Sequence, residues 1–265
     1  MPPIQLATVL PGAEPFNEGN VNATFRGQIL LADHSVQGAI LKDLDARQLA
    51  NELLVSTLAR RSGLPTPDAY LALVRADDLA LNFAPFLPDG NRIVFASVDV
   101  KVPNISFQVH HATNEERQQI IREILDWHYL GALYGFDTWV ANIDRHRGNL
   151  LFGRRGEVWL IDHGHCLSGP SWLPADLRQD GHYRNRLSEW LTVEMDEAQK
   201  MKRLREAVAK TSSFQAINIE DIVTNRYMIY LLNQGDDQVI TDFLRGRLDY
   251  VPIHTSNALG VALFL

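Results

Sequence analysis

Two kinds of hydrophobic pattern follow one another along the chain. Between residues 24 and 83, short apolar runs bounded by turn residues predict strands at 29–31, 39–42, 70–74 and 79–83. From residue 113 onward, apolar positions recur at helical spacing over longer stretches. The pattern therefore predicts a small sheet followed by a mainly helical region.

One helix with clear end signals interrupts the predicted strands. Asp45 can cap its first turn, and Gln48 three residues later completes a capping box. Apolar residues at helical spacing follow up to residue 58, and Gly63 with Pro65 ends the run. We expect this helix to pack on the sheet and to present Glu52 to it.

The second half of the chain predicts several helices. Thr113 and Glu116 form another capping box, which opens an apolar helix expected to end near Gly135. Amphipathic helices are expected around residues 187–195, 201–208, 219–232 and 239–244. The first twenty residues are rich in proline and glycine and are predicted to form a loose arm.

A predicted hairpin between the two helical stretches carries the candidate chemistry. Residues 150–152 and 158–161 are strand-like, and residues 153–156 supply the turn. Asp144 and Asn149 precede the first strand, and Asp162 follows the second. Antiparallel pairing would bring all three side chains to the same end of the hairpin.

Oxygen ligands that converge in this way suit Mg²⁺, which binds one or two carboxylates and keeps water or phosphate oxygens as its other ligands. A third polar group could then accept a proton from a nucleophile.

The number of histidines near these residues suggests a different class of enzyme, a metal-dependent hydrolase. The sequence contains no His-Glu-x-x-His or His-x-Asp-x-x-His pattern, however. The candidate metal ligands of such a hydrolase are His110, His111, His146, His163, His165, Asp144 and Asp162.

Length, composition and charge limit the classes of protein to which the chain could belong. A chain of 265 residues with 46% hydrophobic residues can bury a full core. The net charge of −7 argues against a general nucleic-acid binder, and the single cysteine, Cys166, excludes an intramolecular disulfide. No apolar run approaches the roughly 20 residues of a membrane span, and the start lacks a signal-peptide pattern. We expect a cytoplasmic protein without direct nucleic-acid binding.

Two motifs, joined by the hairpin, resemble a known family. Residues 144–149 read Asp-Arg-His-Arg-Gly-Asn, and residues 161–165 read Ile-Asp-His-Gly-His. They are similar to the catalytic and metal-binding loops of the HipA-like kinases and of the related phosphatidylinositol 3-/4-kinase group. Residues 62–67, Ser-Gly-Leu-Pro-Thr-Pro, resemble the Gly-Leu-Pro-x-Pro segment that ends the first helix in HipA-like kinases.

The resemblance implies an α+β fold of the two-lobed, protein-kinase-like type. Its N-lobe would be a small antiparallel sheet with one helix, and its C-lobe would be mainly helical. We expect an N-terminal arm at 1–20, the N-lobe at 21–86 and the C-lobe, with both loops, at 87–265.

The resemblance also implies site residues and cofactors, ATP and Mg²⁺. Asp144 would accept the proton of the attacking hydroxyl or orient it, while Asn149 and Asp162 would hold Mg²⁺. Lys42 would bind the α- and β-phosphates, and Glu52 would orient Lys42. His146 is either catalytic or a structural residue bonded to the backbone, and the sequence leaves both open.

The remaining nucleotide contacts are expected only from their position in the chain relative to the motifs. No Gly-x-Gly-x-x-Gly loop occurs between residues 20 and 27, where a phosphate-covering loop is expected, so Thr24 is the candidate there. Residues 82–86, which include Phe83 and Pro85, are expected to form the hinge between the lobes and to bind the adenine edge through their backbone.

The predicted function is transfer of the γ-phosphate of ATP to a serine or threonine hydroxyl of a protein. A kinase for a lipid or small molecule and a nucleotide-binding pseudokinase stay open as alternatives. Residues 168–180 contain one basic residue, Arg178, which favours a protein over an anionic lipid. HipA-like enzymes include members of toxin–antitoxin pairs, so an antitoxin or another regulatory partner is a further expectation.

Overall fold

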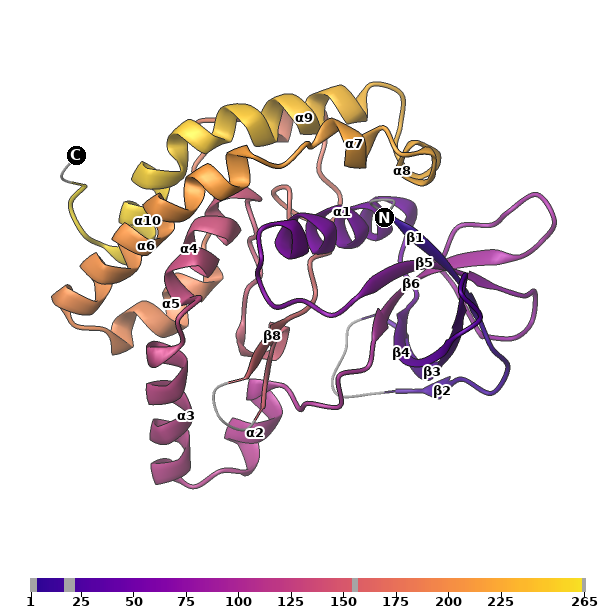
Figure 1. Ribbon diagram of the computed structural model, residues 1–265, viewed down its shortest axis with the longest axis horizontal. Helices are drawn as coiled ribbons and strands as arrows, with labels where there is room; N and C mark the ends of the chain where they lie inside the picture. The colour runs from indigo at the N-terminus through magenta and orange to yellow at the C-terminus, as the bar shows by residue number, and fades with distance from the viewer. Residues whose placement is uncertain (1–3, 17–21, 154–156, 264–265) are drawn as a thin grey trace.

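The N-terminal part of the molecule is a six-stranded sheet that closes on itself. The computed structural model describes residues 4–16, 22–153 and 157–263 (Figure 1). The strand order is β1-β5-β6-β4-β3-β2, and β1 also pairs with β3, which closes a small barrel. The strands are β1 Gln5–Val9, β2 Glu14–Pro15, β3 Thr24–Leu31, β4 Val36–Lys42, β5 Ala69–Val74 and β6 Arg92–Val98. Alternate small and branched residues, such as Ile29, Ala39 and Val94, fill its interior.

The sheet contains segments that the sequence did not predict as strands. Residues 5–9 and 14–15 lie within the expected loose arm, yet β1 pairs in parallel with β5 and in antiparallel with β3. The strand predicted at 79–83 is wrong, because the strand that follows β5 is β6, which pairs with both β5 and β4. The sheet therefore continues to Val98, beyond the expected lobe boundary at residue 86.

Helix α1, Ala46–Arg61, joins the sheet to the helical part and confirms the predicted helix. The Asp45 carboxylate accepts a hydrogen bond from the backbone N–H of Gln48 at 2.8 Å. The helix packs against β5 and β6 on one side and against α7 and α8 on another. It is therefore buried over most of its surface, Glu52 included.

The helical part surrounds α4, whose residues are all buried. Trp139 of α4 stacks on Phe214 of α6 with ring centroids 5.0 Å apart. The predicted capping box at Thr113 is confirmed, but the expected single helix is two, because the chain leaves the helical conformation at Trp127. The α-helices are α2 Ile105–His111, α3 Asn114–Asp126, α4 Leu130–Trp139, α5 Arg186–Leu191, α6 Glu197–Gln215, α7 Glu220–Val223, α8 Arg226–Leu231, α9 Asp236–Arg247 and α10 Val251–Leu259. Short 3-10 turns are η1 Arg147–Asn149, η3 Pro174–Asp176, η4 Thr192–Glu194 and η5 Leu248–Tyr250.

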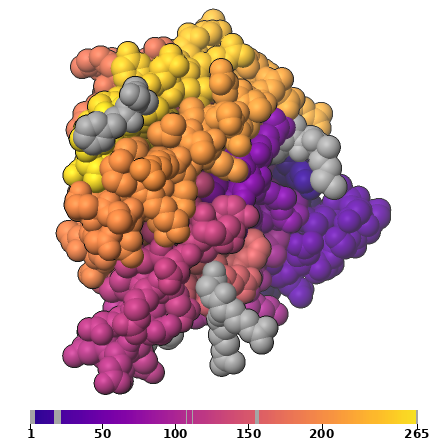
Figure 2. All heavy atoms as spheres, turned by 60° about the vertical axis from the view of Figure 1, so that its left-hand side comes forward, coloured from indigo at the N-terminus to yellow at the C-terminus, as the bar shows by residue number. Residues whose placement is uncertain are grey.

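The predicted hairpin lies between the sheet and the helices. Strands β7, Leu150–Phe152, and β8, Val158–Leu160, pair in antiparallel; residues 154–156 of the expected turn lie outside the described part. The backbone N–H of Leu160 donates to the carbonyl of Pro65 at 2.8 Å, which fixes the hairpin on the segment after α1. Figure 2 shows the sheet and the C-terminal helices on opposite sides of this region. Among the helices of the described residues, none combines the length and the apolar character of a membrane span.

Candidate active site

Arg145 holds the two ends of the hairpin together. Its side chain is fully buried, and its Nη1 donates to the carbonyl of Asn149 at 3.1 Å and to that of Ile161 at 2.7 Å. The carboxylate of Asp137, on α4, accepts from Nε and Nη2 of Arg145 at 3.0 and 3.2 Å. This paired fork is a geometry that a planar guanidinium provides. Arg145 thus brings Asn149 and the segment before Asp162 to one place, as antiparallel pairing predicted.

The loop that carries Asp144 is fixed on the same helix. Asn142 donates through its side-chain Nδ2 to Asp137 at 2.9 Å. The Oδ1 atom of Asn142 accepts from the backbone N–H of Asp144 at 3.0 Å. Asn149 donates its Nδ2 to the carbonyl of Asp144 at 2.8 Å. The side-chain oxygen of Asn149 is therefore the atom left to serve as a ligand or acceptor.

Lys42 links the sheet, α1 and the end of the hairpin. Its Nζ lies 2.6 Å from Oε1 of Glu52 and 3.1 Å from Oδ1 of Asp162. Glu52 is almost fully buried, whereas the Asp162 side chain is 43% exposed. Asp162 has φ of 59°, a left-handed conformation that aspartate adopts more readily than most residues. Three residues that are distant in sequence thus form one ion-pair cluster.

The pKa values within this cluster favour a charged lysine. Burial alone would lower the pKa of Lys42, but the carboxylates of Asp162 and Glu52 outweigh that effect and raise the pKa above its ordinary value. Burial raises the pKa of Glu52 against the attraction of Lys42. For Asp162, the effect of its partial burial is outweighed by Lys42, which lowers the pKa to about 2. The cluster therefore presents an ammonium group beside an ionised, solvent-accessible carboxylate.

Helix α1 also holds the segment that follows Asp162. The backbone N–H of His163 donates to Oε2 of Glu52 at 2.8 Å. Asn51 donates to the carbonyls of Gly164, Cys166 and Gly169, and accepts from Nε1 of Trp172. Burial and the neighbouring Arg145 lower the pKa of His163 well below its ordinary value. The neighbours Asn51 and Glu52 thus couple α1 to the segment 163–169 that follows Asp162.

Asp144 lies among cationic and imidazole side chains. Arg186, from α5, donates its Nη1 to Oδ1 of Asp144. Nε2 of His146 lies 3.8 Å from Oδ2 of Asp144, and Nδ1 of His165 lies 4.0 Å from the same oxygen. Nδ1 of His146 accepts the backbone N–H of Gly148 at 2.9 Å. That bond leaves the hydrogen of the neutral imidazole on Nε2, facing Asp144.

His146 thus makes the backbone contact expected of a structural residue and also faces the candidate base. Burial lowers its pKa, and Arg186 acts in the same direction against the attraction of Asp144. Both functions considered from the sequence stay compatible with this position.

Thr24 lies in β3 directly opposite Lys42. Its hydroxyl donates to the carbonyl of Asn22 at 3.1 Å, within its own loop. Residues 20 and 21, at the start of the predicted phosphate-covering loop, lie outside the described part. Thr24 thus lies close to Lys42 in the sheet, but the Thr24 hydroxyl already donates its hydrogen within its own loop.

The segment 82–86 does not connect the two parts of the molecule. It lies between β5 and β6, and the connection from the sheet to α2 is formed by residues 99–104. Phe83 is 61% exposed, and the carbonyl of Pro85 accepts the backbone N–H of Ile93 at 3.1 Å. The expected hinge was displaced because the last strand of the sheet was predicted at 79–83.

Asp43, which follows Lys42, explains the path of this segment. Its fully buried carboxylate accepts backbone N–H groups from Asn82 at 2.7 Å, Phe83 at 3.0 Å and Ala84 at 2.7 Å. These three N–H groups are therefore not free to donate to a nucleotide. The end of β4 is instead fixed to the loop between β5 and β6.

Sequence reasoning missed Asp43, Asn51, Asp137 and Arg186. Asp137 carried a usable signal: a carboxylate in a strongly apolar helix needs a buried partner, and Arg145 follows shortly after it. Asp43, Asn51 and Arg186 carry no comparable signal, because their partners come from distant segments.

The alternative of a metal-dependent hydrolase requires a set of histidine and carboxylate ligands. In the part of the chain that the structure describes, no three His, Cys, Asp or Glu side chains are arranged to hold a metal ion. The His111 side chain lies outside the described part. His163 is buried against Glu52 and Arg145 instead. The metal-dependent hydrolase is therefore not supported.

Comparison with protein-family models agrees with the motifs. A family model described as HipA-like kinase matches residues 36–218, which include the Lys42 cluster and both loops. The chain is similar to a solved structure titled "Crystal structure of A Helicobacter pylori proinflammatory kinase CtkA", with 12% sequence identity, a TM-score of 0.49, and coverage of 89% of this chain and 94% of that chain. No curated protein matches in sequence. Since the family model covers more than half of its length, the chain belongs to the HipA-like kinase family.

Proposed function

We propose that the protein transfers the γ-phosphate of ATP to a serine or threonine hydroxyl of a protein. The observation that carries this proposal is the cluster in which Nζ of Lys42 lies 2.6 Å from Glu52 and 3.1 Å from Asp162. A charged lysine held beside an accessible carboxylate is the arrangement that phosphoryl transfer requires for phosphate binding and metal binding.

The donor atoms at the hairpin end fit Mg²⁺. Asn149 offers a side-chain oxygen, and Asp162 offers an ionised carboxylate whose pKa is lowered to about 2. Both are hard oxygen ligands, and phosphate and water oxygens would complete the shell. When bound there, Mg²⁺ would neutralise phosphate charge, and Lys42 would bind the phosphate oxygens.

Asp144 would act on the acceptor hydroxyl. In the proposed step, the hydroxyl oxygen forms a bond to the γ-phosphorus and its proton passes to the Asp144 carboxylate. The bond between the γ-phosphorus and the bridging oxygen breaks, and its electron pair leaves with ADP. Positioning of the reactants and electrostatic stabilisation account for most of the rate enhancement in such transfers.

A protein acceptor is favoured by the segment after Asp162. Residues 168–180 contain one basic residue, Arg178, which pairs with Asp180. An anionic membrane lipid would call for a cluster of basic residues at this place. An antitoxin or other regulatory partner belongs to the same proposal and rests on the family resemblance alone. A cytoplasmic location is also proposed, and it rests on the single cysteine, Cys166, which fits a reducing compartment.

The test is incubation of the purified protein with γ-labelled ATP, Mg²⁺ and cell lysate, followed by phosphoamino-acid analysis. We expect label on serine or threonine with wild type, and loss of at least 100-fold with Asp144→Asn, in line with typical general-base contributions. Asp249→Asn, at an exposed aspartate of η5, is the matched control and should keep full activity. Label in the lipid extract instead of the protein would overturn the choice of substrate. Mg·ATP binding without any turnover would indicate a pseudokinase.

A further inference from the structure

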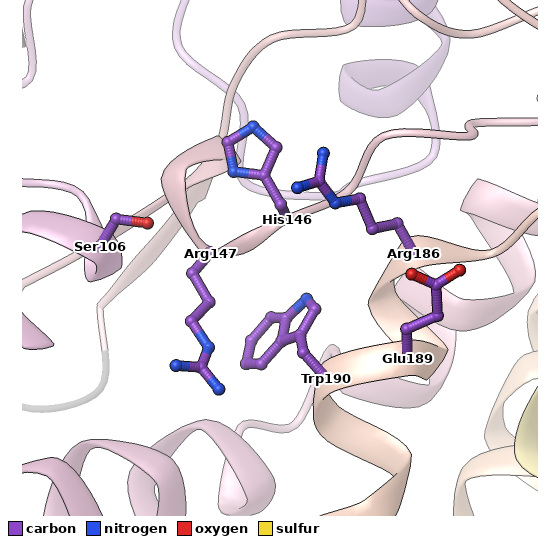
Figure 3. Close-up of a pocket in the computed structure, with 6 residues that line it drawn as sticks. All are labelled: Ser106, His146, Arg147, Arg186, Glu189 and Trp190. Carbon is purple, nitrogen blue, oxygen red and sulfur yellow. The ribbon is translucent and has the colours of Figure 1, made fainter. Parts of the chain in front are cut away.

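A positively charged pocket lies beside Asp144. Its volume is about 390 Å³, and its lining residues come from α2, the catalytic loop and α5 (Figure 3). They are Ser106, His146, Arg147, Arg186, Glu189 and Trp190. Because Arg186 also contacts Asp144, the pocket adjoins the place where the proposed acceptor hydroxyl would lie.

The charges around the pocket do not cancel. The carboxylate of Glu189 is already bound by Nε and Nη2 of Arg184, each at 2.6 Å. Arg186 is paired with Asp144, whereas Arg147 has no carboxylate partner among the described ion pairs. Within a chain of net charge −7, this site therefore presents an uncompensated guanidinium next to the catalytic loop.

Arg147 is held in place by an aromatic surface. Its guanidinium carbon lies 5.3 Å from the centre of the Trp190 ring, within the range of cation–π attraction. The indole is fixed in turn, because its Nε1 donates to the carbonyl of Arg145 at 3.0 Å. Figure 3 shows the guanidinium of Arg147 beside the Trp190 ring, and Arg186 and His146 on the opposite side of the pocket. A pre-oriented guanidinium binds carboxylate or phosphate groups with less loss of side-chain entropy.

We propose that this pocket binds an acidic segment of the protein substrate, so that the enzyme selects a serine or threonine flanked by a carboxylate or phosphate group. Arg147 is the main anchor, and Arg186 is the second. This inference rests on the proposed protein-kinase function and specifies its substrate class.

Arg186 couples binding to the chemistry. In the free protein one of its N–H groups is bonded to Oδ1 of Asp144, the carboxylate that would take the hydroxyl proton. An anionic group in the pocket competes for Arg186 and leaves that oxygen available to the acceptor hydroxyl. Acidic substrates should therefore have a higher kcat as well as a lower KM. An anchor that only binds the substrate would lower KM and leave kcat unchanged.

The experiment compares three peptides of equal length in which one serine is flanked by glutamate, alanine or lysine. A fourth peptide, with a phosphoserine neighbour, separates phosphate from carboxylate as the preferred anion. We expect kcat/KM to fall about tenfold from the glutamate to the alanine peptide, which corresponds to about 1.4 kcal/mol. It should fall further for the lysine peptide, because a like charge then replaces the lost charge pair. Arg147→Glu should reverse the order of the glutamate and lysine peptides. Arg205→Glu, an exposed arginine of α6, makes the same charge change outside the pocket and should leave the order unchanged.

Binding of the same peptides, measured by fluorescence anisotropy at low salt, separates the two proposals. Preferential binding of the glutamate or phosphoserine peptide, lost in Arg147→Glu, supports the pocket even if no peptide is phosphorylated. Absence of label from the lysate proteins as well would then overturn the kinase proposal and leave the pocket supported. Equal binding and equal turnover of glutamate and alanine peptides would overturn the pocket and leave the kinase proposal intact. Unchanged melting temperatures of the variants show that folding is not the cause.

Discussion

Replacing Asp43 by asparagine tests whether one buried carboxylate joins the end of β4 to the loop between β5 and β6. Oδ2 of Asp43 accepts the N–H of Asn82 at 2.7 Å, and Oδ1 accepts those of Phe83 at 3.0 Å and Ala84 at 2.7 Å. Asparagine keeps one carbonyl oxygen of similar size and shape. Its NH₂ group would face an N–H donor where the carboxylate had offered an acceptor.

The expected magnitude follows from these contacts. One charge-assisted hydrogen bond is lost, which costs about 1.5–3 kcal/mol, and the other two are weakened by loss of the charge. We therefore expect Asp43→Asn to lower the free energy of unfolding by about 3 kcal/mol. For a chain of this size, about 2–4 °C per kcal/mol corresponds to a fall in melting temperature of about 6–12 °C.

Urea denaturation and thermal melting measure this change. Asp45→Asn is the matched control, because Asp45 caps α1 two residues further on and asparagine caps helices equally well. We expect the control to stay within about 0.5 kcal/mol of wild type. If Asp43→Asn also stays within that range, Asp43 does not hold the loop, and the reasoning is refuted.

Three further predictions concern the site itself. Glu52→Gln should weaken ATP binding at least tenfold and cost about 1–3 kcal/mol of stability, because Lys42 keeps only the exposed carboxylate of Asp162; calorimetric titration that shows unchanged ATP affinity would contradict this. Arg145→Met leaves the carboxylate of Asp137 buried without its cation and should cost about 3–5 kcal/mol in chemical denaturation; a loss below about 1 kcal/mol would show that the hairpin ends do not depend on Arg145. Stability should fall as the pH drops below about 6.5, because the unfolded chain binds a proton that buried His163 excludes, and again between about pH 4 and 2, where Asp162 remains ionised only in the folded state. Denaturation curves at stepped pH test both windows, and constant stability from pH 7 to 5 would exclude the first.

Local sequence features were sufficient for the elements that depend on neighbouring residues. The capped start of α1 at Asp45 and the capping box at Thr113 were predicted because a cap is formed within one helical turn. The hairpin of β7 and β8 followed from two apolar runs and a short connection. The placement of Asn149 and Asp162 at one end of that hairpin followed in turn, since antiparallel pairing leaves no other arrangement.

The pairing of strands that are distant in the chain could not be predicted from local sequence features. β1 lies in a segment whose prolines and glycines indicated a loose arm, yet it pairs with β5 and β3, from distant parts of the chain. β6 begins at Arg92 after an irregular loop, and nothing local indicates that it completes the sheet. The misplaced hinge at 82–86 is a direct consequence of that missed strand.

The sequence by itself determined the family, helix α1, and the hairpin with Asn149 and Asp162 at its end, because each rests on motifs of residues close together in the chain. Only the tertiary structure decided that Asp43 holds the 82–84 loop, that Arg145 joins the hairpin ends through Asp137, and that Arg186 contacts Asp144. The physical reason is that a buried charge must find its partner in three dimensions. Closure of the barrel and packing of α1 bring together partners that are many residues apart in the chain. Neither the spacing of motifs nor hydrophobic periodicity indicates which of these distant residues will meet.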